Sequence, residues 1–276
     1  MAQTDTKIHA LMVCKNEGDV VAYTLRKALS WADAIYVMDN GSSDDSWAQV
    51  QEVAAEDARV VPWKVDDRPF SDCIRSRVFN EFRERSRDGD WWCRLDADEE
   101  YVDDPREFLA KIPRRFHVVW ANFIEFFVTW RDVDELAFDR PIAEIVQQLR
   151  HYQTSNSEHR FLRFRHRLDW PEDAPWPRHM GIPYTEKITL KHYKYRSPDQ
   201  IRRRMATRQE AIGGGLIDPA HWRGDWEQKL LSDEGELRLC EDGENYIIDS
   251  DCHPPHLDPP VRHLIKRLMH GLKIWP

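Results

Sequence analysis

Residues 91–100 read WWCRLDADEE, an apolar run that ends in a cluster of acids. The first half, Trp91–Leu95, predicts a buried strand. The carboxylates that follow it are Asp96, Asp98, Glu99 and Glu100. Carboxylates crowded at a strand end repel one another unless a cation lies among them, and oxygen ligands favour hard ions such as Mg²⁺ or Mn²⁺. The stretch therefore predicts a site for a metal and a substrate diphosphate; a solvated acidic turn is the alternative.

Length, cysteine usage and charge narrow the class of protein. The 276 residues suffice for one large α/β domain with its own core. Five cysteines without a CxxC pair indicate neither a disulfide framework nor a zinc site, and they favour a reducing, cytoplasmic setting. A net charge of −9 argues against general nucleic-acid binding. Because no apolar stretch of about 18 residues occurs, we expect no membrane-spanning helix, and we expect no cleaved signal.

Strand and helix signals alternate through the first 110 or so residues. We expect strands at Ile8–Cys14, Ala34–Met38, Arg59–Trp63 and Trp91–Leu95. Helices between them are marked by the apolar spacings Val21/Leu25, Trp47/Val50 and Ile74/Val78. This rhythm is typical of an open, mostly parallel sheet, in which ligands bind beyond the carboxyl ends of the strands.

Three polar clusters fall at that predicted edge of the sheet. They are Cys14–Glu17, Asp39–Asn40 and Asp96–Asp98. We also expect Ser42 or Ser43 to cap the helix that follows the second cluster. Clusters from three strands at one edge predict a single binding site.

After residue 110 the rhythm loosens. Expected elements are a β-rich stretch over Phe116–Trp130, a helix over Ile142–Arg150, strands at Phe161–Arg165 and Thr189–Tyr193, and a helix from Ser197-Pro198 to about Ala211, ended by Gly213–Gly215.

The ordered blocks Val13–Glu17, Val37–Asp44 and Leu95–Glu99 resemble the nucleotide-sugar-dependent glycosyltransferases of the GT-A fold, in particular the inverting family 2. The resemblance is good over residues 7 to about 110 and loose beyond. It implies an α/β, Rossmann-like, mostly parallel sheet flanked by helices, with a C-terminal helical and loop extension. The implied domains are a catalytic domain, 1–210, with a nucleotide-binding half, 7–110, and an acceptor half, 111–210, followed by the extension, 211–276.

The resemblance also implies roles for the polar residues of the first half. Asn16 and Glu17 match positions that line the nucleotide pocket, and Asp39 matches the acid that accepts hydrogen bonds from the base or ribose. Asp96 and Asp98 match the paired acids of the DxD motif, whose second member ligates the metal and whose first reaches the ribose or a metal-bound water.

Two further polar groups lie between these blocks. Asp66 and Asp67 follow the third strand, where relatives often place another nucleotide contact, with Asp67 the expected one; a plain surface turn is the alternative. Arg75 or Arg77 on the next helix is expected to face the diphosphate, unless both are ordinary solvated helix residues.

His192 is the expected third metal ligand, after Asp96 and Asp98. Several GT-A enzymes return a histidine to the metal from a later strand, and imidazole suits Mn²⁺ better than Mg²⁺. A basic cluster follows at the start of the next helix: Lys194, Arg196 and Arg202–Arg204. It is expected to hold the leaving diphosphate or an anionic acceptor, the alternative being a solvated face.

The implied reaction is displacement at the anomeric carbon, with one carboxylate removing the proton of the acceptor hydroxyl. The chain departs here from the common Glu-Asp pattern of relatives. Candidate bases are Glu125, Asp169, Glu172, Asp173 and Glu186. Spacing favours Asp173 and Glu186.

The C-terminal segment predicts a basic amphipathic helix. Apolar residues at helical spacing between Val261 and Leu272 are accompanied by lysines and arginines and by Trp275. Such a helix suits peripheral contact with a membrane through residues 261–275, at its cytoplasmic face. The alternative is a helix that docks on the enzyme's own core or on a second subunit.

Together these features predict a Mn²⁺- or Mg²⁺-dependent inverting glycosyltransferase. It would move a sugar from a nucleoside-diphosphate donor to a hydroxyl of a glycan or lipid-linked acceptor, in bacterial surface polysaccharide assembly by family likeness. One rival is a nucleotidyltransferase, for which Cys14–Gly18 is a poor phosphate loop. The other is a catalytically inactive sugar- or metal-binding module.

Overall fold

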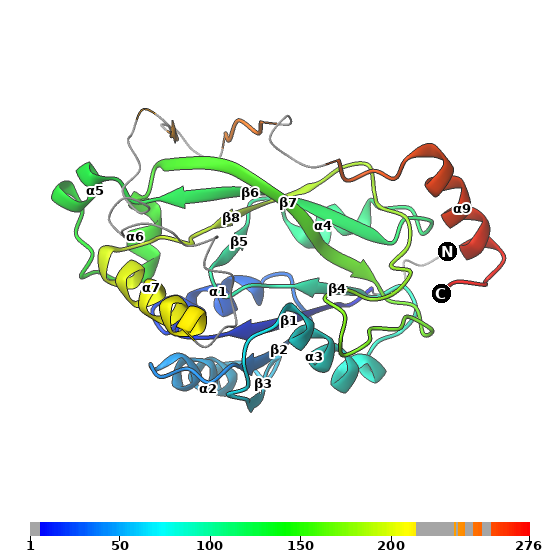
Figure 1. Cartoon of the computed structure of the whole chain (residues 1–276), viewed down its shortest axis with the longest axis horizontal. Coiled ribbons are helices and arrows are strands. Elements are labelled where there is room, and N and C mark those ends of the chain that lie inside the picture. Colours follow the sequence, from blue (N-terminus) through cyan, green and yellow to red (C-terminus); the bar gives the residue numbers. More distant parts are fainter. Residues whose placement is uncertain (1–5, 214–234, 236, 241–244, 250–254) are drawn as a thin grey trace.

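The structure is a computed structural model that describes residues 6–213, 235, 237–240, 245–249 and 255–276. Its strands are β1 (Ile8–Cys14), β2 (Ala34–Asp39), β3 (Val60–Val65), β4 (Trp91–Arg94), β5 (Glu99–Tyr101), β6 (Val118–Phe127), β7 (His151–Arg163), β8 (Ile188–His192) and β9 (Arg238–Leu239). Its α-helices are α1 (Val21–Ala28), α2 (Ser46–Glu56), α3 (Arg75–Phe82), α4 (Pro105–Ala110), α5 (Trp130–Glu135), α6 (Ile142–Gln148), α7 (Pro198–Gly213) and α9 (Pro260–Gly271). The described strands form one sheet in the order β3-β2-β1-β4-β7-β6-β8-β5, with β9 paired to β7 (Figure 1).

The sheet is parallel in its first half and mixed in its second. β3, β2, β1 and β4 run parallel, as their alternation with helices predicts. β7 runs antiparallel to both β4 and β6, whereas β8 is parallel to β6 and antiparallel to β5. α5 and α6 connect β6 to β7 in the chain, and the two strands pair directly with each other in opposite directions. The result is a mixed α/β sheet flanked by helices.

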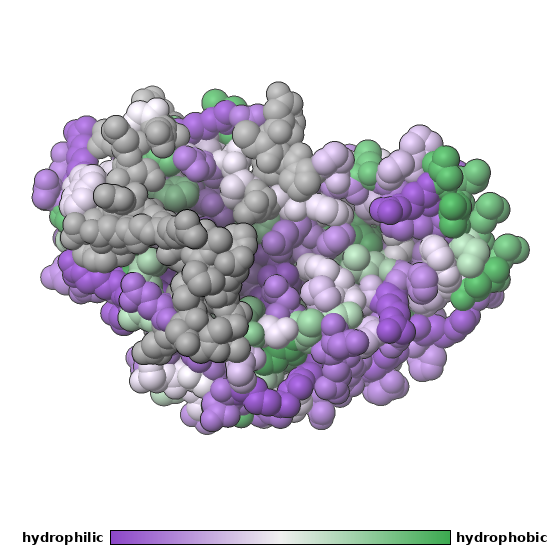
Figure 2. All heavy atoms as spheres, in the orientation of Figure 1, coloured by the Kyte–Doolittle hydropathy of each residue, from purple (hydrophilic) through white to green (hydrophobic). Residues whose placement is uncertain are grey.

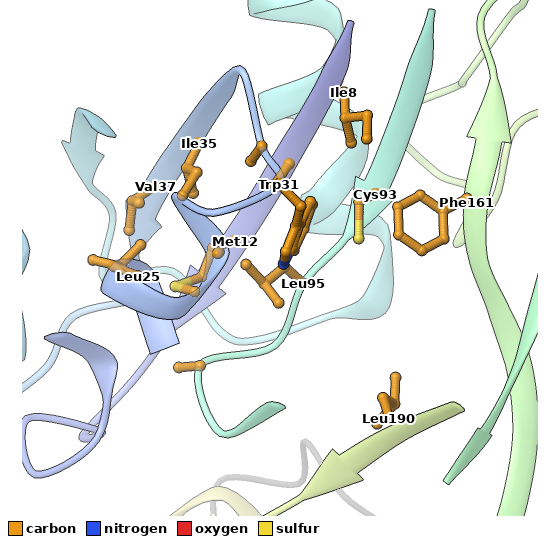
Figure 3. Packing of buried hydrophobic residues seen from close by; sticks show 14 of the residues in the cluster. Ile8, Met12, Leu25, Trp31, Ile35, Val37, Cys93, Leu95, Phe161 and Leu190 are labelled. Carbon is orange, nitrogen blue, oxygen red and sulfur yellow. The ribbon is translucent and has the colours of Figure 1, made fainter. Parts of the chain in front are cut away.

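Apolar residues on the two faces of β1 build two separate cores. Met12 packs with Leu25 of α1 and with Cys93, on the face that α1 and α2 cover (Figure 3). Leu11 points the other way and packs with Phe79 of α3. Because β1 is covered on both faces, all seven of its residues are buried, which explains why all of them except His9 are apolar.

The start of α2 differs from the expectation. The helix begins at Ser46, and neither Ser42 nor Ser43 caps it. The Ser42 backbone N–H donates to Asp39 at 2.7 Å, and the Ser43 N–H donates to the Asn16 side chain at 2.8 Å. Both serines are therefore held by the loops of the polar edge, one turn too early to cap the helix.

The C-terminal extension returns to the sheet. α7 continues to Gly213, so the boundary expected at residue 210 falls inside this helix, and Gly214 and Gly215 lie outside the described residues. β9 adds to the start of β7. Farther on, α9 packs beside the segment that precedes β6, where the rings of His270 and His117 are 4.9 Å apart.

His117 is a buried, neutral histidine beneath α9. Its Nδ1 accepts the backbone N–H of Ile182 at 3.2 Å, and Gly181 adopts a φ of +107° against the ring. A Cβ on Gly181 would come within 2.4 Å of Nδ1, so only glycine fits there. Burial, with a smaller effect of Arg165, lowers the pKa of His117 to about 2.

We expect this histidine to make the protein acid-sensitive. Below pH 6.5, about the pKa of histidine in the unfolded chain, His117 is protonated in the unfolded state but stays neutral in the folded state. The free energy of unfolding therefore falls by about 1.4 kcal/mol per pH unit. Between pH 6.5 and pH 5 the loss from this residue is about 2 kcal/mol. Urea unfolding of His117→Gln should show a flatter dependence on pH than the parent protein. The exposed His166→Gln is the control, and equal pH dependence in all three proteins would contradict the assignment.

Candidate active site

The predicted polar clusters meet at one edge of the sheet. Cys14 and Asp39, at the carboxyl ends of β1 and β2, are paired in register. β4 lies on the other side of β1 and leads into the loop that carries Asp96 and Asp98. β5 then pairs Glu99 with His192, which brings the end of β8 to the same place. Residues almost 180 positions apart in the chain thus share one site.

Asn16 joins three segments at this edge. It adopts a left-handed backbone conformation, with a φ of +55°, which asparagine tolerates better than most residues. Its backbone N–H donates to the Ser42 hydroxyl at 2.9 Å, and its side-chain amide donates to Thr207 of α7 at 3.1 Å. Asn16 therefore ties the loop after β1 to the loop after β2 and to α7.

Asp39 lies at the floor of the edge and is 1% exposed. One of its carboxylate oxygens accepts the Ser42 N–H, and the other lies 3.8 Å from the Cys14 sulfur. Asp67 is exposed beside Gly41, where a Cβ on the glycine would come within 3.0 Å of the Asp67 Cα. The loops that carry Asp39 and Asp67 therefore meet at Gly41.

Asp66 does not belong to a plain surface turn. It is buried and bound by Arg68, with Lys64 and Arg77 also within ion-pair distance. Hydrogen bonding from Arg68 lowers the pKa of Asp66 in spite of desolvation. Asp66 is consequently occupied by its own cations, and Arg77 faces Asp66 and Glu172 rather than Asp96.

Arginines surround Asp96. Arg75 donates to one carboxylate oxygen at 2.7 Å and Arg160 to the other at 3.2 Å, while Arg94 lies 3.7 Å away. Burial would raise the pKa of Asp96, but these three guanidinium groups outweigh it and hold the pKa well below its usual range. Both oxygens of Asp96 therefore have cationic partners within the protein.

The buried Asp98 and the partly buried His192 face each other. An Asp98 oxygen lies 3.4 Å from His192 Nε2, and Glu125 of β6 lies 3.4 Å from the other ring nitrogen. Burial would lower the pKa of His192, but Asp98 and then Glu125 raise it to about 10. The other Asp98 oxygen accepts from Arg204 of α7 at 3.2 Å. The chain thus arranges Asp98, His192 and Glu125 in a row.

The basic cluster after β8 divides between the site and the surface. Arg204 bridges Asp98 and Glu17, and the fully buried Arg196 binds Glu17 and Asp19. Arg202 and Arg203 are exposed on α7. Glu17, which the sequence places in the nucleotide pocket, is therefore held by two arginines that the predicted cluster supplies.

Asp98 and His192 are the residues that would hold a divalent cation at this edge, with Glu125 behind the ring. Within the described ranges no three His, Cys, Asp or Glu side chains converge on one point. Such ions, however, commonly take only one or two protein ligands and complete their shell with phosphate and water. A carboxylate behind the distal ring nitrogen is also the usual setting of a metal-bound histidine. Metal at Nε2 must replace a proton, so affinity should rise with pH.

The family model described as Glycosyl transferase family 2 matches residues 10–169, which carry most of this edge. The chain belongs to glycosyl transferase family 2. It is accordingly a glycosyltransferase, and its mixed sheet is that of the GT-A fold. Among the described residues of this family 2 protein, no helix is long and apolar enough to cross a membrane.

Solved structures of similar shape are remote from this glycosyltransferase in sequence. A mannosyltransferase from Pyrobaculum calidifontis, solved with GDP-Man and Mn²⁺, is 11% identical over 78% of this chain and 66% of its own, with a TM-score of 0.41. TarS 1–349 of S. aureus, solved with UDP, is 14% identical over 78% and 68%, with a TM-score of 0.36. The chain thus spans about two thirds of each. Comparison with curated protein sequences gives no match.

The candidate bases of this family 2 enzyme lie in different surroundings. Glu125 is buried behind His192, and Asp169 is exposed and lies 3.7 Å from Arg178. Glu172 and Asp173 are exposed on the loop after β7. Trp176 of that loop packs against Arg94, 5.4 Å from guanidinium carbon to ring centroid, so the loop borders the acid cluster.

Glu186 is placed unfavourably for a base. It is exposed and comes two residues before β8, whereas His192 ends that strand. Six residues of extended chain span roughly 20 Å. Glu186 is close to His192 in the sequence, but the extended strand between them places Glu186 far from Asp98.

Three partners of Asp96 escape the sequence analysis, although Glu99 itself belongs to the predicted acid cluster. Arg94, Glu99 and Arg160 are not predicted as partners of Asp96, although Arg160 is 2% exposed and binds both acids. Burial raises the pKa of Glu99 to about 7 against the effect of Arg160. Arg94 offers a usable signal, because it ends the apolar strand WWCR and a buried guanidinium requires an acidic partner. Arg160 lies in the mostly polar β7 and offers none.

Proposed function

We propose that this glycosyltransferase moves a sugar from a nucleoside-diphosphate donor to a hydroxyl of a glycan or lipid-linked acceptor, with inversion and with Mn²⁺ or Mg²⁺ as cofactor. The observation that carries the proposal is the pair Asp98 and His192, 3.4 Å apart at the carboxyl edge with Glu125 behind the ring. A bound ion supplies positive charge to the departing diphosphate. Imidazole in the shell favours Mn²⁺ over Mg²⁺. A place in surface polysaccharide assembly belongs to the same proposal by family likeness.

Several residues around Asp98 and His192 are proposed to bind different parts of the donor. Asp39 keeps one oxygen without an N–H partner among the described residues, which suits hydrogen bonds from the base or ribose. Asn16 and Glu17 on the loop after β1, and Asp67 after β3, are proposed to contact the same nucleotide. Arg75 binds Asp96 and is proposed also to contact the diphosphate, a usual partner of guanidinium groups.

We assign Asp173 as the base. It takes the proton of the acceptor hydroxyl while that oxygen forms a bond to the anomeric carbon and the bond from this carbon to the diphosphate breaks. No enzyme nucleophile takes part, so the configuration inverts. Support comes from the loop of Asp173, which touches the acid cluster through Trp176 and Arg94 and touches Arg77 through Glu172.

Asp173→Asn should lower kcat by about 10²- to 10⁴-fold, the usual contribution of a general base. Affinity for the nucleotide should stay the same, because the loop does not form the nucleotide pocket. Rates and calorimetric binding of the same preparations measure the two quantities. Glu186→Gln is the matched control and should leave both unchanged. Unaltered turnover in Asp173→Asn would remove it from the role of base.

Calorimetric binding of UDP, GDP, dTDP, CDP and CMP, each with and without Mn²⁺, tests the donor and metal together. We expect one nucleoside diphosphate to bind tightly, and only with metal. Metal-independent binding would refute the metal site, and the absence of binding would favour an inactive module.

We further propose contact with a membrane through residues 261–275. α9 turns its polar side to the protein, where His263, Lys266 and His270 are half-buried. Its apolar stripe is left outside, with exposed fractions from 48% to 71%: Val261, Leu264, Ile265, Leu268 and Leu272. Figure 1 shows α9 at one end of the molecule, and Figure 2 shows hydrophobic side chains gathered at the margin of that end. An amphipathic helix that docked on its own core would bury that stripe.

Replacing Leu264 and Leu268 by aspartate should therefore abolish sedimentation with vesicles of phosphatidylcholine and phosphatidylglycerol. Each leucine contributes about 1.5–3 kcal/mol when it leaves water, and the new charges oppose insertion. Because both side chains are about half exposed, the folded protein should keep its thermal stability. Ala110→Asp, exposed on α4, is the control. Equal sedimentation of all three proteins would refute the contact.

A further inference from the structure

α9 and the transfer centre lie at opposite ends of the sheet. β1 starts at the end of the molecule that carries α9 and runs toward the edge of Asp98 (Figure 1). α9 is fastened at its end: Arg167 donates to the carbonyl oxygen of Lys273 at 2.7 Å, and the rings of Trp275 and His179 stack 4.2 Å apart. The orientation of the helix on the protein is therefore set by contacts on its inner side.

The length of β6 gives the distance between α9 and the transfer centre. His117, which packs on His270 of α9, comes directly before this strand. Glu125, which lies behind His192, is eight residues farther along it. At about 3.3 Å per residue the two positions are roughly 26 Å apart. The outer face of α9 lies farther still, by up to a helix diameter of about 10 Å.

A bilayer is the occupant that suits the exposed stripe. Arg262 and Arg267 flank the stripe on its two sides and are exposed, although the whole chain carries a net charge of −9. A second copy of α9 would bring like charges together, whereas anionic headgroups would pair with them. The outward direction of the stripe, away from the body of the protein, then sets the side on which the bilayer lies.

We propose that the acceptor is a glycan of several sugar units carried on a membrane lipid, rather than a lipid phosphate or a lipid with a single sugar. The apolar face of an interfacial helix enters the headgroup and acyl boundary by only about 5–10 Å. Asp98 then stands more than roughly 20 Å from the bilayer, given the length of β6. The distal hydroxyl of an extended glycan reaches that height, and a hydroxyl at the lipid does not. This inference rests on the proposed glycosyl transfer and membrane contact.

Collisional quenching by lipids with nitroxide-labelled headgroups tests the geometry directly. Single fluorophores are attached at Ala48→Cys, exposed on α2 near the transfer edge, and at Gly271→Cys, where a side chain meets open space. The background protein has Cys73, Cys240 and Cys252 replaced by serine. Vesicles contain phosphatidylcholine, phosphatidylglycerol and the nitroxide lipid. We expect strong quenching at position 271 and none at position 48, with both proteins sedimenting with the vesicles.

The other outcomes overturn the inference, and they show whether the separation, the membrane contact or the proposed transfer function has failed. Quenching at both positions would bring the transfer edge down to the bilayer and refute the separation, with membrane contact retained. Quenching at neither, with sedimentation, would place another surface on the membrane. Failure to sediment would refute the contact itself. Calorimetric titration of the same labelled proteins with nucleoside diphosphate and Mn²⁺ reports independently on the proposed transfer function.

Discussion

Asp98→Asn is expected to abolish metal-dependent nucleotide binding and to lower kcat/KM for sugar transfer by at least about 10³-fold. The amide keeps the volume of the carboxylate but loses its charge, so the partner of His192 and of Arg204 becomes neutral. Neutralisation of a leaving diphosphate by a metal contributes several kcal/mol, and each 1.4 kcal/mol is about a factor of ten in rate. Titration with Mn²⁺ and the diphosphate selected by the parent protein, followed by rate measurements, gives both values.

A matched control separates chemistry from folding in this experiment. Glu107→Gln on α4 makes the same carboxylate-to-amide change at an exposed position and should behave like the parent protein. Circular dichroism and urea unfolding of Asp98→Asn show whether the fold survives the loss of a buried charge. A folded Asp98→Asn protein that still binds the nucleotide only with metal, and at parent affinity, would disprove the assignment of Asp98 as a ligand.

Arg196→Met is expected to destabilise the protein by about 3–5 kcal/mol, the usual cost of breaking a buried ion pair from one side. Arg196 is 0% exposed and donates to Asp19 at 2.7 Å through Nε, to Glu17, and to the carbonyl of Tyr193 at 3.2 Å. Methionine fills part of the volume and satisfies none of these acceptors. Among the residues that the structure describes, Glu17 would then keep Arg204 alone as a cationic partner.

The midpoint of urea unfolding measures this loss. Arg203→Met, seven residues farther along the chain on the exposed side of α7, is the comparison and should change stability by less than about 0.5 kcal/mol. A loss below about 1 kcal/mol in Arg196→Met would mean that the cluster of Glu17, Asp19 and Arg196 is dispensable. The loop after β1 would then be held by Asn16 and by the backbone N–H groups of Glu17 and Gly18, which donate to Ser46 and Asp44.

The first half of the fold was predictable from the sequence because its signals are local. Apolar runs of strand length and helical spacings define β1 to β4 and their helices, and the parallel rule then places Cys14, Asp39 and Asp96 at one edge. The antiparallel return of β7 beside β4 was not predictable in this way. It depends on pairing between segments about 70 residues apart, for which hydrophobic periodicity carries no information.

The arginines of the site show the same limit at the level of side chains. Arg160 looks from its neighbours like one member of an alternating strand, and only the pairing of β7 with β6 and β4 turns it toward Asp96 and Glu99. Glu186 shows the opposite case: its position in the sequence favours it as a base, but it precedes the start of β8, whereas His192 ends that strand.

The sequence by itself determined an α/β fold with acids gathered at the carboxyl ends of its first strands, because local periodicity and strand-end chemistry are written in consecutive residues. The glycosyltransferase activity came from the resemblance of its ordered blocks to family 2. Only the tertiary structure decided that Asp96 is surrounded by arginines, that Asp98 meets His192 and Glu125, and that α9 turns its apolar stripe outward. These are relations between distant segments. They follow from which strands pair and which helix face is buried, and no stretch of neighbouring residues encodes them.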